Sequence, residues 1–549
     1  MNLKTNRPPL FWVWLGALLA AFVAWWARPL LLIDETRYLS VAWEMWRTSE
    51  FLVPHINGET YAHKPPLLFW FMHAGWSVFG VQLWWPRLLG FLFLTSAALL
   101  LKHLVDLLLP LVKQENAGTF AAIIFLGTLS IFAFSTMVMF DLLLLNCILL
   151  TWLALINTHL GGSVVRGALL FGFGIGLGIL AKGPVVLLFA LPPAFAAAHW
   201  AANARNIAWV TFLGVLLGAG VALAWAIPAG IAGGEEYRDA IFWGQTAGRV
   251  TDSFAHARPW HWYLPLLPAM LLPWVLLPNF WTWVRKNPAP NKDQSSREQR
   301  FLLWASIPAF LILCFLSGKQ PHYLVPVIAA ISALFGIQLA KGLSKSNGRI
   351  KGISIGPSVL FLLTGICLLI LPQVGDSNPR LAWLSQDWSI VPGGLMLLAA
   401  GLWLLAAKRQ RHHILQLGLF CPLWISLLHL GLRGPLQGNY NLAPLSQKIA
   451  QWQDAGQDVA FSGAMYHGQF SFLGRLEDPL ANPTTLRQML DWAKDNPTEP
   501  ILIVLDKHSR KVFSSKATSL LAYGTKQIAV WETASDFQKA IREDSKASD

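Results

Sequence analysis

Long runs of apolar residues, separated by short polar segments, occupy most of this 549-residue chain. A helix that crosses a lipid bilayer needs about 20 mostly apolar residues. By that measure the sequence predicts thirteen membrane-spanning helices, at residues 10–32, 84–109, 118–134, 137–157, 164–181, 183–200, 207–231, 261–284, 301–317, 321–341, 353–372, 390–407 and 412–432. We therefore expect an α-helical polytopic membrane protein.

The positions of lysine and arginine between these runs predict the orientation, because cytoplasmic loops carry the excess of such residues. Cations lie before the first run and on alternate connections, at Lys4, Arg7, Lys113, Arg166, Arg205, 285–300, 341–351 and 408–411. We expect the N-terminus in the cytoplasm of a bacterium and, with an odd number of spans, the C-terminal tail in the periplasm. The first run is too long for a cleavable signal peptide and lacks a small-residue cleavage site.

The pattern changes after residue 432, which divides the chain into a membrane domain, 1–432, and a periplasmic domain, 433–549. Short apolar runs, typical of strands, alternate with helical patterns in this tail. The strands are expected at 458–462, 501–505 and 528–531, and the helices at 485–494 and 535–543. We therefore expect a small α/β domain, which serves as a scaffold or lid at the periplasmic mouth.

Two long connections, 33–83 and 232–260, are expected on the periplasmic side of the membrane domain. Helical, half-apolar pieces within the first one, at 35–46 and 64–79, predict helices lying along the membrane surface. Tryptophans of these pieces are expected at headgroup level, at Trp43, Trp46, Trp70 and Trp76.

Composition supports a membrane protein, since 54% of the residues are hydrophobic and only 13% are charged, against about 25% charged in soluble domains. The net charge of +13 is accounted for by loop cations beside anionic lipid. No aromatic and basic motif for RNA is present, so we expect no nucleic-acid partner. The four cysteines lie in apolar runs without the spacing of metal ligands.

Two adjacent carboxylates, Asp34 and Glu35, follow the first apolar run, with Arg37 and Tyr38 behind them. Asp34 could cap a helix, an arrangement that the helix dipole and Glu35 would also favour. The alternative is that the carboxylates are directed at a substrate in the headgroup layer.

A second motif, from Tyr61 through His63 and Lys64 to two prolines, predicts the start of a helix, because proline fits the first helical position. The Lys64 ammonium and the helix N-terminus are both electropositive, so together they would form an anion site. The alternative is a snorkelling lysine, whose ammonium extends to the lipid headgroups while its methylene groups stay in the apolar layer.

Further ionisable residues lie at turns or ends of apolar runs on the predicted periplasmic side. An ionised Asp141 facing lipid would cost about 2.5–3.5 kcal/mol, so we expect it to face a partner or water. The other candidates on this side are Lys182, His256, Arg258, Lys319 and Tyr323, for which ordinary turn chemistry is the alternative. Six segments sharing one side predict a cluster of carboxylates and cations at the headgroup level.

These motifs resemble the bacterial aminoarabinose transferases of lipid A, within the protein O-mannosyltransferase superfamily. The resemblance covers residues 10–340 and implies the membrane glycosyltransferase fold called GT-C. It implies that Asp34 and Asp141 are catalytic or cavity aspartates and that Lys64 and Tyr61 contact a carrier phosphate. It also implies that Arg37, Tyr38, His256 and Tyr323 line the pocket. The further substrate-binding candidates, chosen for their position and chemistry, are Glu35, His63, Lys182, Arg258 and Lys319.

One position departs from the pattern, since the family has glutamate where this chain has His63. His63 and His256 could bind zinc through their imidazoles, but two ligands do not make a closed site. We therefore expect no required metal or other cofactor.

The expected activity is transfer of a sugar from undecaprenyl phosphate to lipid A or another envelope glycolipid. Lys64, Arg37 and Lys182 or Lys319 would stabilise the departing phosphate. Two alternatives stay open: a protein O-glycosyltransferase of the same fold, and a transporter or flippase of lipid-linked sugars. Such transporters usually have repeated halves, and no internal repeat is evident here.

Overall fold

The computed structural model describes residues 10–112, 116–244, 257–286, 297–345, 355–377, 381–385, 388–406 and 413–547. The chain divides into two compact units. Unit 1 comprises Met1–Trp25, Ala62–Leu369 and Ile390–Gly431, and unit 2 comprises Trp26–Tyr61, Ile370–Ser389 and Leu432–Asp549.

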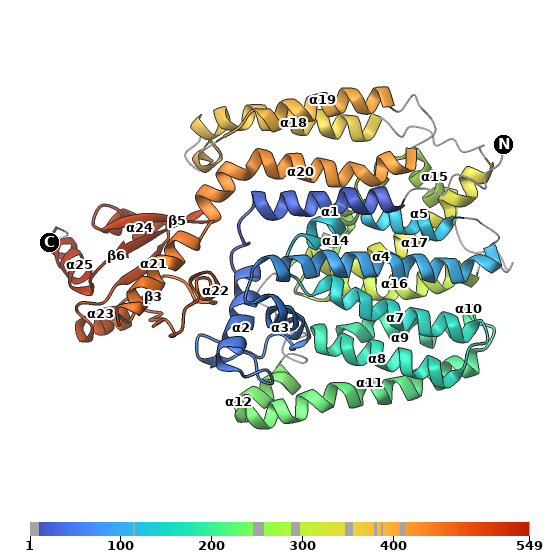
Figure 1. Cartoon of the computed structure of the whole chain (residues 1–549), viewed down its shortest axis with the longest axis horizontal. Helices are drawn as coiled ribbons and strands as arrows, with labels where there is room; N and C mark the ends of the chain where they lie inside the picture. Colours follow the sequence, from blue (N-terminus) through green and yellow to red (C-terminus); the bar gives the residue numbers. More distant parts are fainter. Residues whose placement is uncertain are drawn as a thin grey trace. The chain divides into compact units, whose positions relative to one another are not determined.

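Unit 1 is built from α-helices (Figure 1). Those lying wholly or mainly in it are α1 (Leu10–Ala27), α3 (Leu67–Phe79), α4 (Trp84–Val112), α5 (Ala117–Leu126), α6 (Leu129–Ser135), α7 (Asp141–His159), α8 (Val164–Lys182), α9 (Leu187–Phe195), α10 (Ala197–Trp200), α11 (Ala204–Ala232), α12 (Gly234–Asp239), α14 (Tyr263–Met270), α15 (Pro278–Lys286), α16 (Arg297–Phe315), α17 (Val325–Lys345), α18 (Ile355–Ser377), α19 (Val391–Ala406) and α20 (His413–Tyr440). Short 3-10 or π turns link some of them, namely η2 (Pro184–Val186), η3 (Ala240–Gly244), η4 (Trp260–Trp262), η5 (Trp274–Leu276) and η7 (Pro321–Leu324).

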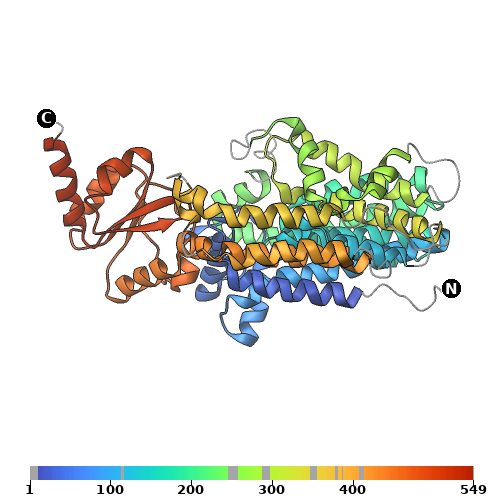
Figure 2. The ribbon, with the colours of Figure 1, turned by 90° about the horizontal axis from the view of Figure 1, so that it is seen from above.

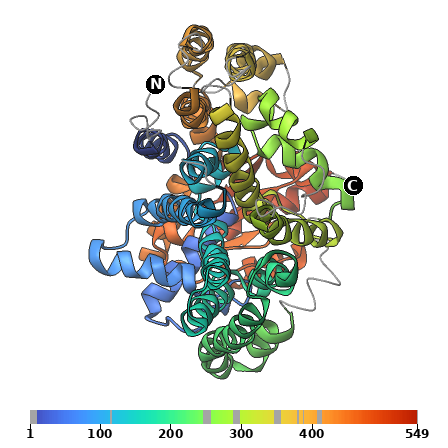
Figure 3. The same ribbon diagram turned by 90° about the vertical axis from the view of Figure 1, so that its right-hand side faces the viewer.

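The long helices of unit 1 pack side by side, and Figure 3 shows many of them nearly end-on. α8 packs against α7 and α11, α4 against α5 and α7, and α17 against α5 and α16. Glycine allows close approaches of this kind, since a Cβ on Gly172 of α8 would lie 2.7 Å from the Leu217 side chain of α11. Small residues at helix contacts of this kind are typical of membrane proteins.

Eight helices in the described part of the chain are long and apolar enough to cross a membrane, and nine if the bent pair α5 and α6 counts as one span. Each of the eight overlaps a predicted span: Leu10–Ala27, Trp84–Leu108, Asp141–His159, Val164–Lys182, Ala204–Ala232, Pro321–Lys341, Ile355–Ser377 and Ile414–Asp454. The polytopic helical fold is therefore confirmed, whereas the number thirteen stays a prediction.

The remaining predicted spans are shorter or broken. Gln299–Phe315 and Val391–Leu405 are apolar helices below the length of a full span. The predicted span 261–284 is not one helix, because it divides into α14, η5 and α15 around Pro273 and Pro278. Proline lacks the N–H that would continue the helical hydrogen-bond ladder.

Unit 2 combines the C-terminal tail with the segment that follows α1. Its elements are α2 (Asp34–Thr48), β1 (His55–Ile56), β2 (Glu59–Thr60), η8 (Ala382–Leu384), α21 (Ala443–Asp454), β3 (Ala460–Ser462), α22 (Ser471–Gly474), α23 (Leu486–Asp495), β4 (Ile501–Leu505), α24 (Lys507–Phe513), β5 (Ser519–Tyr523), β6 (Lys526–Trp531) and α25 (Ala534–Ala547). Its larger sheet has the order β3-β4-β6-β5.

The small α/β domain predicted for the tail is present. β3 pairs parallel to β4, while β6 pairs antiparallel to both β4 and β5. Leu502 and Val504 of β4 face one hydrophobic cluster, and the alternate residues Ile501 and Ile503 face another, as the twofold period of a strand requires. Helix α21 contributes to the first cluster, and α23 and α25 to the second, so helices cover both faces of the sheet (Figure 2).

The two surface helices predicted at 35–46 and 64–79 exist as α2 and α3, and two of their tryptophans have partners within the protein. Trp76 of α3 is 1% exposed and donates its indole N–H to the Gln82 carbonyl. Trp43 of α2 donates to the Leu476 carbonyl in the tail. Trp76 therefore packs inside the protein and Trp43 makes contacts within unit 2, while the headgroup level of these tryptophans stays a prediction.

Candidate functional site

Asp141, the first residue of α7, is buried, with 4% of its side chain exposed. The Lys182 ammonium, from the last residue of α8, donates to Asp141 Oδ1 at 2.5 Å. Each charge also suits its helix end, because the α-helix dipole favours an anion at the N-terminus and a cation at the C-terminus. A charge that is buried without a partner is strongly destabilising. Lys182 is the partner that compensates the buried Asp141 carboxylate.

Two aromatic residues of η7 lie against this ion pair. The Nε2 atom of His322 is 4.0 Å from Asp141 Oδ2, and Lys182 Nζ is 4.8 Å from the centroid of the Tyr323 ring. The His322 and Tyr323 rings meet edge to face, with centroids 4.9 Å apart. Three segments far apart in sequence thus bring Asp141, Lys182, His322 and Tyr323 together, a group called the Asp141 cluster below.

Lys64 lies beside the Asp141 cluster. Its Nζ is 5.9 Å from the ring centroid of Phe140, the residue before Asp141, and its charge acts on the Asp141 carboxylate. Pro65 and Pro66 follow, and α3 begins directly after them, which agrees with the helix start that the double proline predicts. Unit 1 therefore holds two cations and one carboxylate within a small, largely buried volume.

Lys319 and Arg258 are near each other, but the Lys319 ammonium binds backbone carbonyls, whereas both side chains were expected to bind substrate. The Lys319 ammonium is buried and donates to the backbone carbonyls of Arg258, at 2.9 Å, and Leu316. A bridge between Ala257 and Gly318 joins the same two segments. Lys319 thus ties two turns of unit 1 together, while the exposed Arg258 guanidinium lies 6.0 Å from the Trp262 ring.

In unit 2, Asp34 and Arg37 form an ion pair on the first turn of α2. Arg37 Nη2 donates to Asp34 Oδ1 at 2.9 Å, and 53% of the Asp34 side chain is exposed. Tyr38 and Tyr61 are neighbours of the Arg37 charge. The carboxylate and the guanidinium are thus held together, with Asp34 open to a ligand.

Asp34 does not cap α2, so that alternative is wrong. The helix begins at Asp34 itself, and the residue before it, Ile33, donates its N–H to Thr36 Oγ1 at 3.1 Å. Ile33 has φ of 77°, a value that is rare for a β-branched residue. Local backbone strain of this kind is concentrated at functional sites, and here it directly precedes Asp34.

Glu35 serves the fold, in contrast to its predicted place in the pocket. Arg28 donates to both Glu35 oxygens, at 2.5 and 3.1 Å, and the Leu31 N–H donates at 2.7 Å. Glu35 is fully buried and Arg28 nearly so. This bidentate pair fixes the end of α1 to the start of α2.

The two candidate tyrosines of unit 2 are buried, Tyr61 at 3% and Tyr38 at 6% exposed. Burial, and then the nearby Asp34 charge, raises the pKa of the Tyr38 phenol above its usual value. The phenol therefore stays protonated at neutral pH and can donate a hydrogen bond but not act as a base.

The predicted histidines give no metal centre in the described ranges. His63 is exposed on the segment before α3, and His256 lies outside the described residues. Within the described ranges, no group of three or more histidine, cysteine or acidic residues has the arrangement of a metal site.

Sequence reasoning missed two residues with direct contacts to candidates, His322 and Arg28. Both stand next to predicted positions, His322 before Tyr323 and Arg28 at the end of the first apolar run. An arginine at the end of a membrane helix is usually a topology signal. For that reason the sequence alone did not indicate that Arg28 pairs with Glu35, seven residues later.

Comparison with known proteins gives a consistent result. Residues 63–230 match the family model for dolichyl-phosphate-mannose-protein mannosyltransferase. A protein of Pseudomonas fluorescens, named undecaprenyl phosphate-alpha-4-amino-4-deoxy-L-arabinose arabinosyl transferase 2, is 28% identical over 67% of this chain and 64% of its own length. A transferase of the same kind from Sodalis glossinidius is 27% identical over 76% of this chain and 75% of its own length. The chain thus spans about two thirds of the first relative.

A solved structure has the same fold. The crystal structure of ArnT from Cupriavidus metallidurans bound to undecaprenyl phosphate aligns with a TM-score of 0.72 and 19% identity, over 96% of this chain and 99% of that one. The structure of the same protein in the apo state aligns with a TM-score of 0.71. The likeness extends over the helices and the C-terminal sheet alike.

Proposed function

We propose that this chain, an aminoarabinose transferase-like member of the protein O-mannosyltransferase superfamily of GT-C glycosyltransferases, moves a sugar from undecaprenyl phosphate to lipid A or another envelope glycolipid. The observation that carries the proposal is the Asp141 cluster with Lys64 beside it, because buried, paired charges in an apolar helical unit mark functional sites. The names of the relatives supply the donor and the class of sugar.

The chemical demand of this reaction is for positive charge. Cleavage of the sugar–phosphate bond develops oxocarbenium character on the sugar and negative charge on the departing phosphate. A fixed cation in a low-dielectric site stabilises such charge far better than one in water. We assign this role to Lys64, with Arg37 as a second cation.

Lys182 has a different part in the proposal from the one first expected. Since its ammonium is paired with Asp141 at 2.5 Å and lies over the Tyr323 ring, it holds those two side chains in position. Asp141 and Tyr323 then present hydrogen-bonding groups to the sugar, with His322 beside them.

The role of Asp34 depends on the acceptor. A hydroxyl acceptor needs a general base within hydrogen-bond reach, and the exposed Asp34 carboxylate meets that need. An acceptor phosphate is already ionised and needs none, in which case Asp34 orients the sugar and balances Arg37. We propose that no metal or other resident cofactor is required.

The proposed location is the bacterial inner membrane, with the N-terminus in the cytoplasm and residues 433–549 in the periplasm. The membrane location is supported by the apolar helices and the orientation by the loop cations. In this arrangement the sheet domain is a scaffold or lid at the periplasmic side.

A transfer assay tests the proposal. The purified full-length protein is reconstituted with undecaprenyl phosphate-linked aminoarabinose and lipid A, and the product is measured by mass spectrometry. Lys64→Ala and Asp34→Ala should each abolish transfer without lowering the melting temperature. Lys448→Ala, which removes an exposed cation paired with Glu532, is the matched control and should stay active.

The acceptor is resolved in the same assay by replacing lipid A with a hydroxyl-bearing peptide. The family model that matches residues 63–230 is named for a protein mannosyltransferase, so the peptide is a specific competitor. Transfer to the peptide alone would overturn the proposal of a lipid acceptor. Near-normal turnover by Lys64→Ala would remove that residue from the mechanism. Transport of the intact donor without transfer would overturn the proposal that the protein is an enzyme.

A further inference from the structure

The tail segment around α22 is joined to α2 by side chains. Ser40 Oγ of α2 donates to the Gly468 carbonyl and accepts from the Phe472 N–H at 3.2 Å. The Trp43 indole donates to the Leu476 carbonyl at 2.9 Å. The two elements lie side by side within unit 2 (Figure 1).

A turn near α2 strengthens the same contact. Asn57 donates to the Leu480 carbonyl at 3.0 Å and accepts from the Leu480 N–H at 2.8 Å. Glu44 of α2 accepts from the Gly58 N–H at 2.8 Å. Residues of the tail are therefore fixed with respect to the α2 residues that carry the proposed chemistry.

His467 is the ionisable tail residue next to this junction. Ser40 lies one helical turn after Arg37, so both side chains project from the same face of α2. Ser40 bonds Gly468, the residue after His467, and the Arg37 charge acts on the His467 ring. The His467 N–H is held by Gln469 Oε1 at 2.8 Å, and Gln469 is buried. The half-buried imidazole thus stands on a rigid loop.

The environment of His467 and Arg37 suits an anion. Burial, and then the Arg37 charge, lowers the pKa of His467 below its usual value, so the ring is neutral at pH 7 and donates one N–H. The Arg37 Nε atom is buried, and no described residue gives it a hydrogen-bond partner. The other ionisable groups that act on Arg37 are Asp34, Tyr38 and Tyr61. Around the loop of His467, Tyr466 interacts with Glu44, and Tyr523 hydrogen-bonds Gln469.

We propose that His467, supplied by the C-terminal domain, is a substrate-binding residue that binds a phosphate group of a lipid substrate together with Arg37. The proposal rests on the proposed function for the identity of the lipid. A bound phosphate would favour the protonated imidazole, because an anion close by stabilises the charged form. Binding therefore takes up a proton at His467, and affinity falls as the pH rises.

Two phosphates fit this chemistry, that of the undecaprenyl carrier and that of a lipid A acceptor. Direct binding distinguishes them without any need for turnover. The full-length protein in nanodiscs is titrated at pH 6 and pH 7.5 with undecaprenyl phosphate, with lipid A, and with undecaprenol as the control that lacks phosphate. The phosphate lipid that contacts His467 should bind more tightly at pH 6, and undecaprenol should show no such dependence.

His467→Gln should weaken binding of that one lipid roughly 10- to 100-fold, as expected for a lost hydrogen bond to a charged group, and remove its pH dependence. His467→Lys, which keeps a cation, should restore the affinity at both pH values. His55→Gln is the matched control, since His55 lies on β1 and bonds the Val53 carbonyl.

Equal binding of both phosphate lipids by His467→Gln and the unchanged protein would overturn the proposal. So would a loss of affinity for undecaprenol as well, because that would mean general damage to the fold. Absence of transfer in the assay of the preceding section, with His467-dependent phosphate binding intact, would refute the proposed function and leave this site standing.

Discussion

The Lys182 ammonium donates a hydrogen bond to Asp141 at 2.5 Å, although 41 residues separate the two. Both groups are largely buried, at 10% and 4% side-chain exposure. The pair joins the end of α8 to the start of α7, with His322 4.0 Å from the Asp141 carboxylate and the Tyr323 ring centroid 4.8 Å from the Lys182 ammonium.

Lys182→Met should destabilise the protein by about 3–5 kcal/mol, because it leaves the Asp141 carboxylate buried without its cation. Transfer should be lost as well. The double variant Asp141→Asn/Lys182→Met should recover most of the melting temperature but not the activity. Lys102→Met is the control: its pair with Asp106 is about one-third exposed, so its loss should cost less than ~1 kcal/mol. Equal effects of the two lysine substitutions would contradict a special role for the buried pair.

Neighbouring carboxylates of α2 should respond in opposite ways. Glu35→Gln removes one side of the buried bidentate pair with Arg28 and should lower stability by about 3–5 kcal/mol. Asp34→Asn changes a half-exposed group and should abolish transfer with a stability change below ~1 kcal/mol. Thermal unfolding of the purified variants, alongside the transfer assay, measures both quantities. A stable but inactive Glu35→Gln would return Glu35 to the substrate site.

Ile33 offers a test of backbone strain. Its φ of 77° suits glycine, so Ile33→Gly should be tolerated and raise the stability by about 1 kcal/mol. Ile33→Pro should be strongly destabilising, since proline fixes φ near −65° and removes the N–H that Thr36 accepts. The melting temperatures of the two variants should therefore move in opposite directions from that of the unchanged protein. A fall for Ile33→Gly would mean that the Ile33 side chain is worth more than the strain.

Asn57 should contribute more to stability than a residue of a surface turn usually does. Asn57→Ala removes both hydrogen bonds to Leu480 and should cost about 1–3 kcal/mol. Gly468→Ala should be comparably harmful, since its φ is 71° and a Cβ would lie 2.7 Å from that of Ser40. Both variants should speed proteolysis in the segment from residue 49 to 66. The control is Gly456→Ala: this glycine also has a positive φ, of 78°, but a Cβ there would meet nothing within 4 Å.

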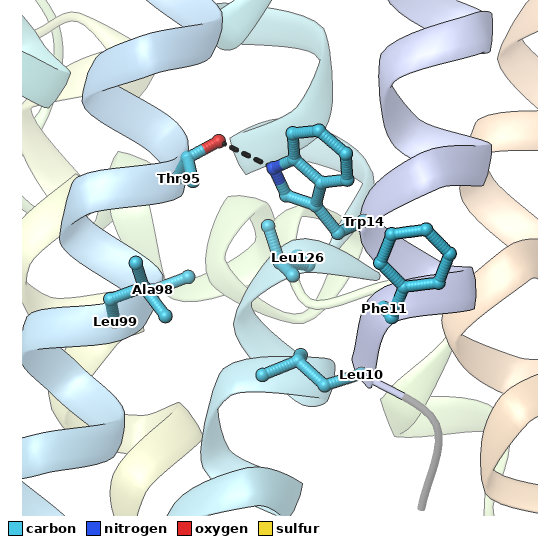
Figure 4. A pocket seen from close by; sticks show the side chains of 7 residues that line it. All are labelled: Leu10, Phe11, Trp14, Thr95, Ala98, Leu99 and Leu126. Carbon is cyan, nitrogen blue, oxygen red and sulfur yellow. Dashed lines mark hydrogen bonds between the residues drawn. The ribbon is translucent and has the colours of Figure 1, made fainter.

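Another feature of unit 1 is a groove lined by apolar side chains (Figure 4). Trp14 of α1 and Thr95 of α4 face each other across it and share a hydrogen bond of 3.0 Å. Its volume is about 290 Å³, and the other lining residues are Leu10, Phe11, Ala98, Leu99 and Leu126. The groove satisfies its own polar groups, which suits a surface covered by hydrocarbon.

Strands and helices of the tail could be predicted because their apolar periodicity is strong. β4 at Ile501–Leu505 was predicted with both ends correct, and β6 and α23 to within two residues. β5 was missed, since its residues at Ser519–Tyr523 are mostly half-exposed and show little alternation. The hairpin of β1 and β2 had a signal that was not used: Asn57-Gly58 is a strong two-residue turn sequence, and both residues have positive φ.

The sequence predicted which residues belong to the candidate site, but it did not predict which of their side chains pair with each other. An ionisable residue in an apolar run predicts that a partner exists, as for Asp141, but the partner comes from another helix and no spacing identifies it. Glu35 and Asp34 look equivalent in the sequence. Only the position of Arg28 shows that the first is structural. The breaks in the predicted span 261–284 were indicated by Pro273 and Pro278, which hydropathy alone does not weigh.

The contacts of α2 with the tail also constrain how the protein is made. Ser40 and Trp43 find their partners 428 and 433 residues further along the chain. At ribosomal rates of about 5–20 residues per second, that delay is roughly 20 to 90 s. During this interval Ser40 and Trp43 of the nascent α2 lack their final hydrogen-bond partners. The contact between α2 and the tail can therefore form only near the end of synthesis, after the helices of unit 1 have been made.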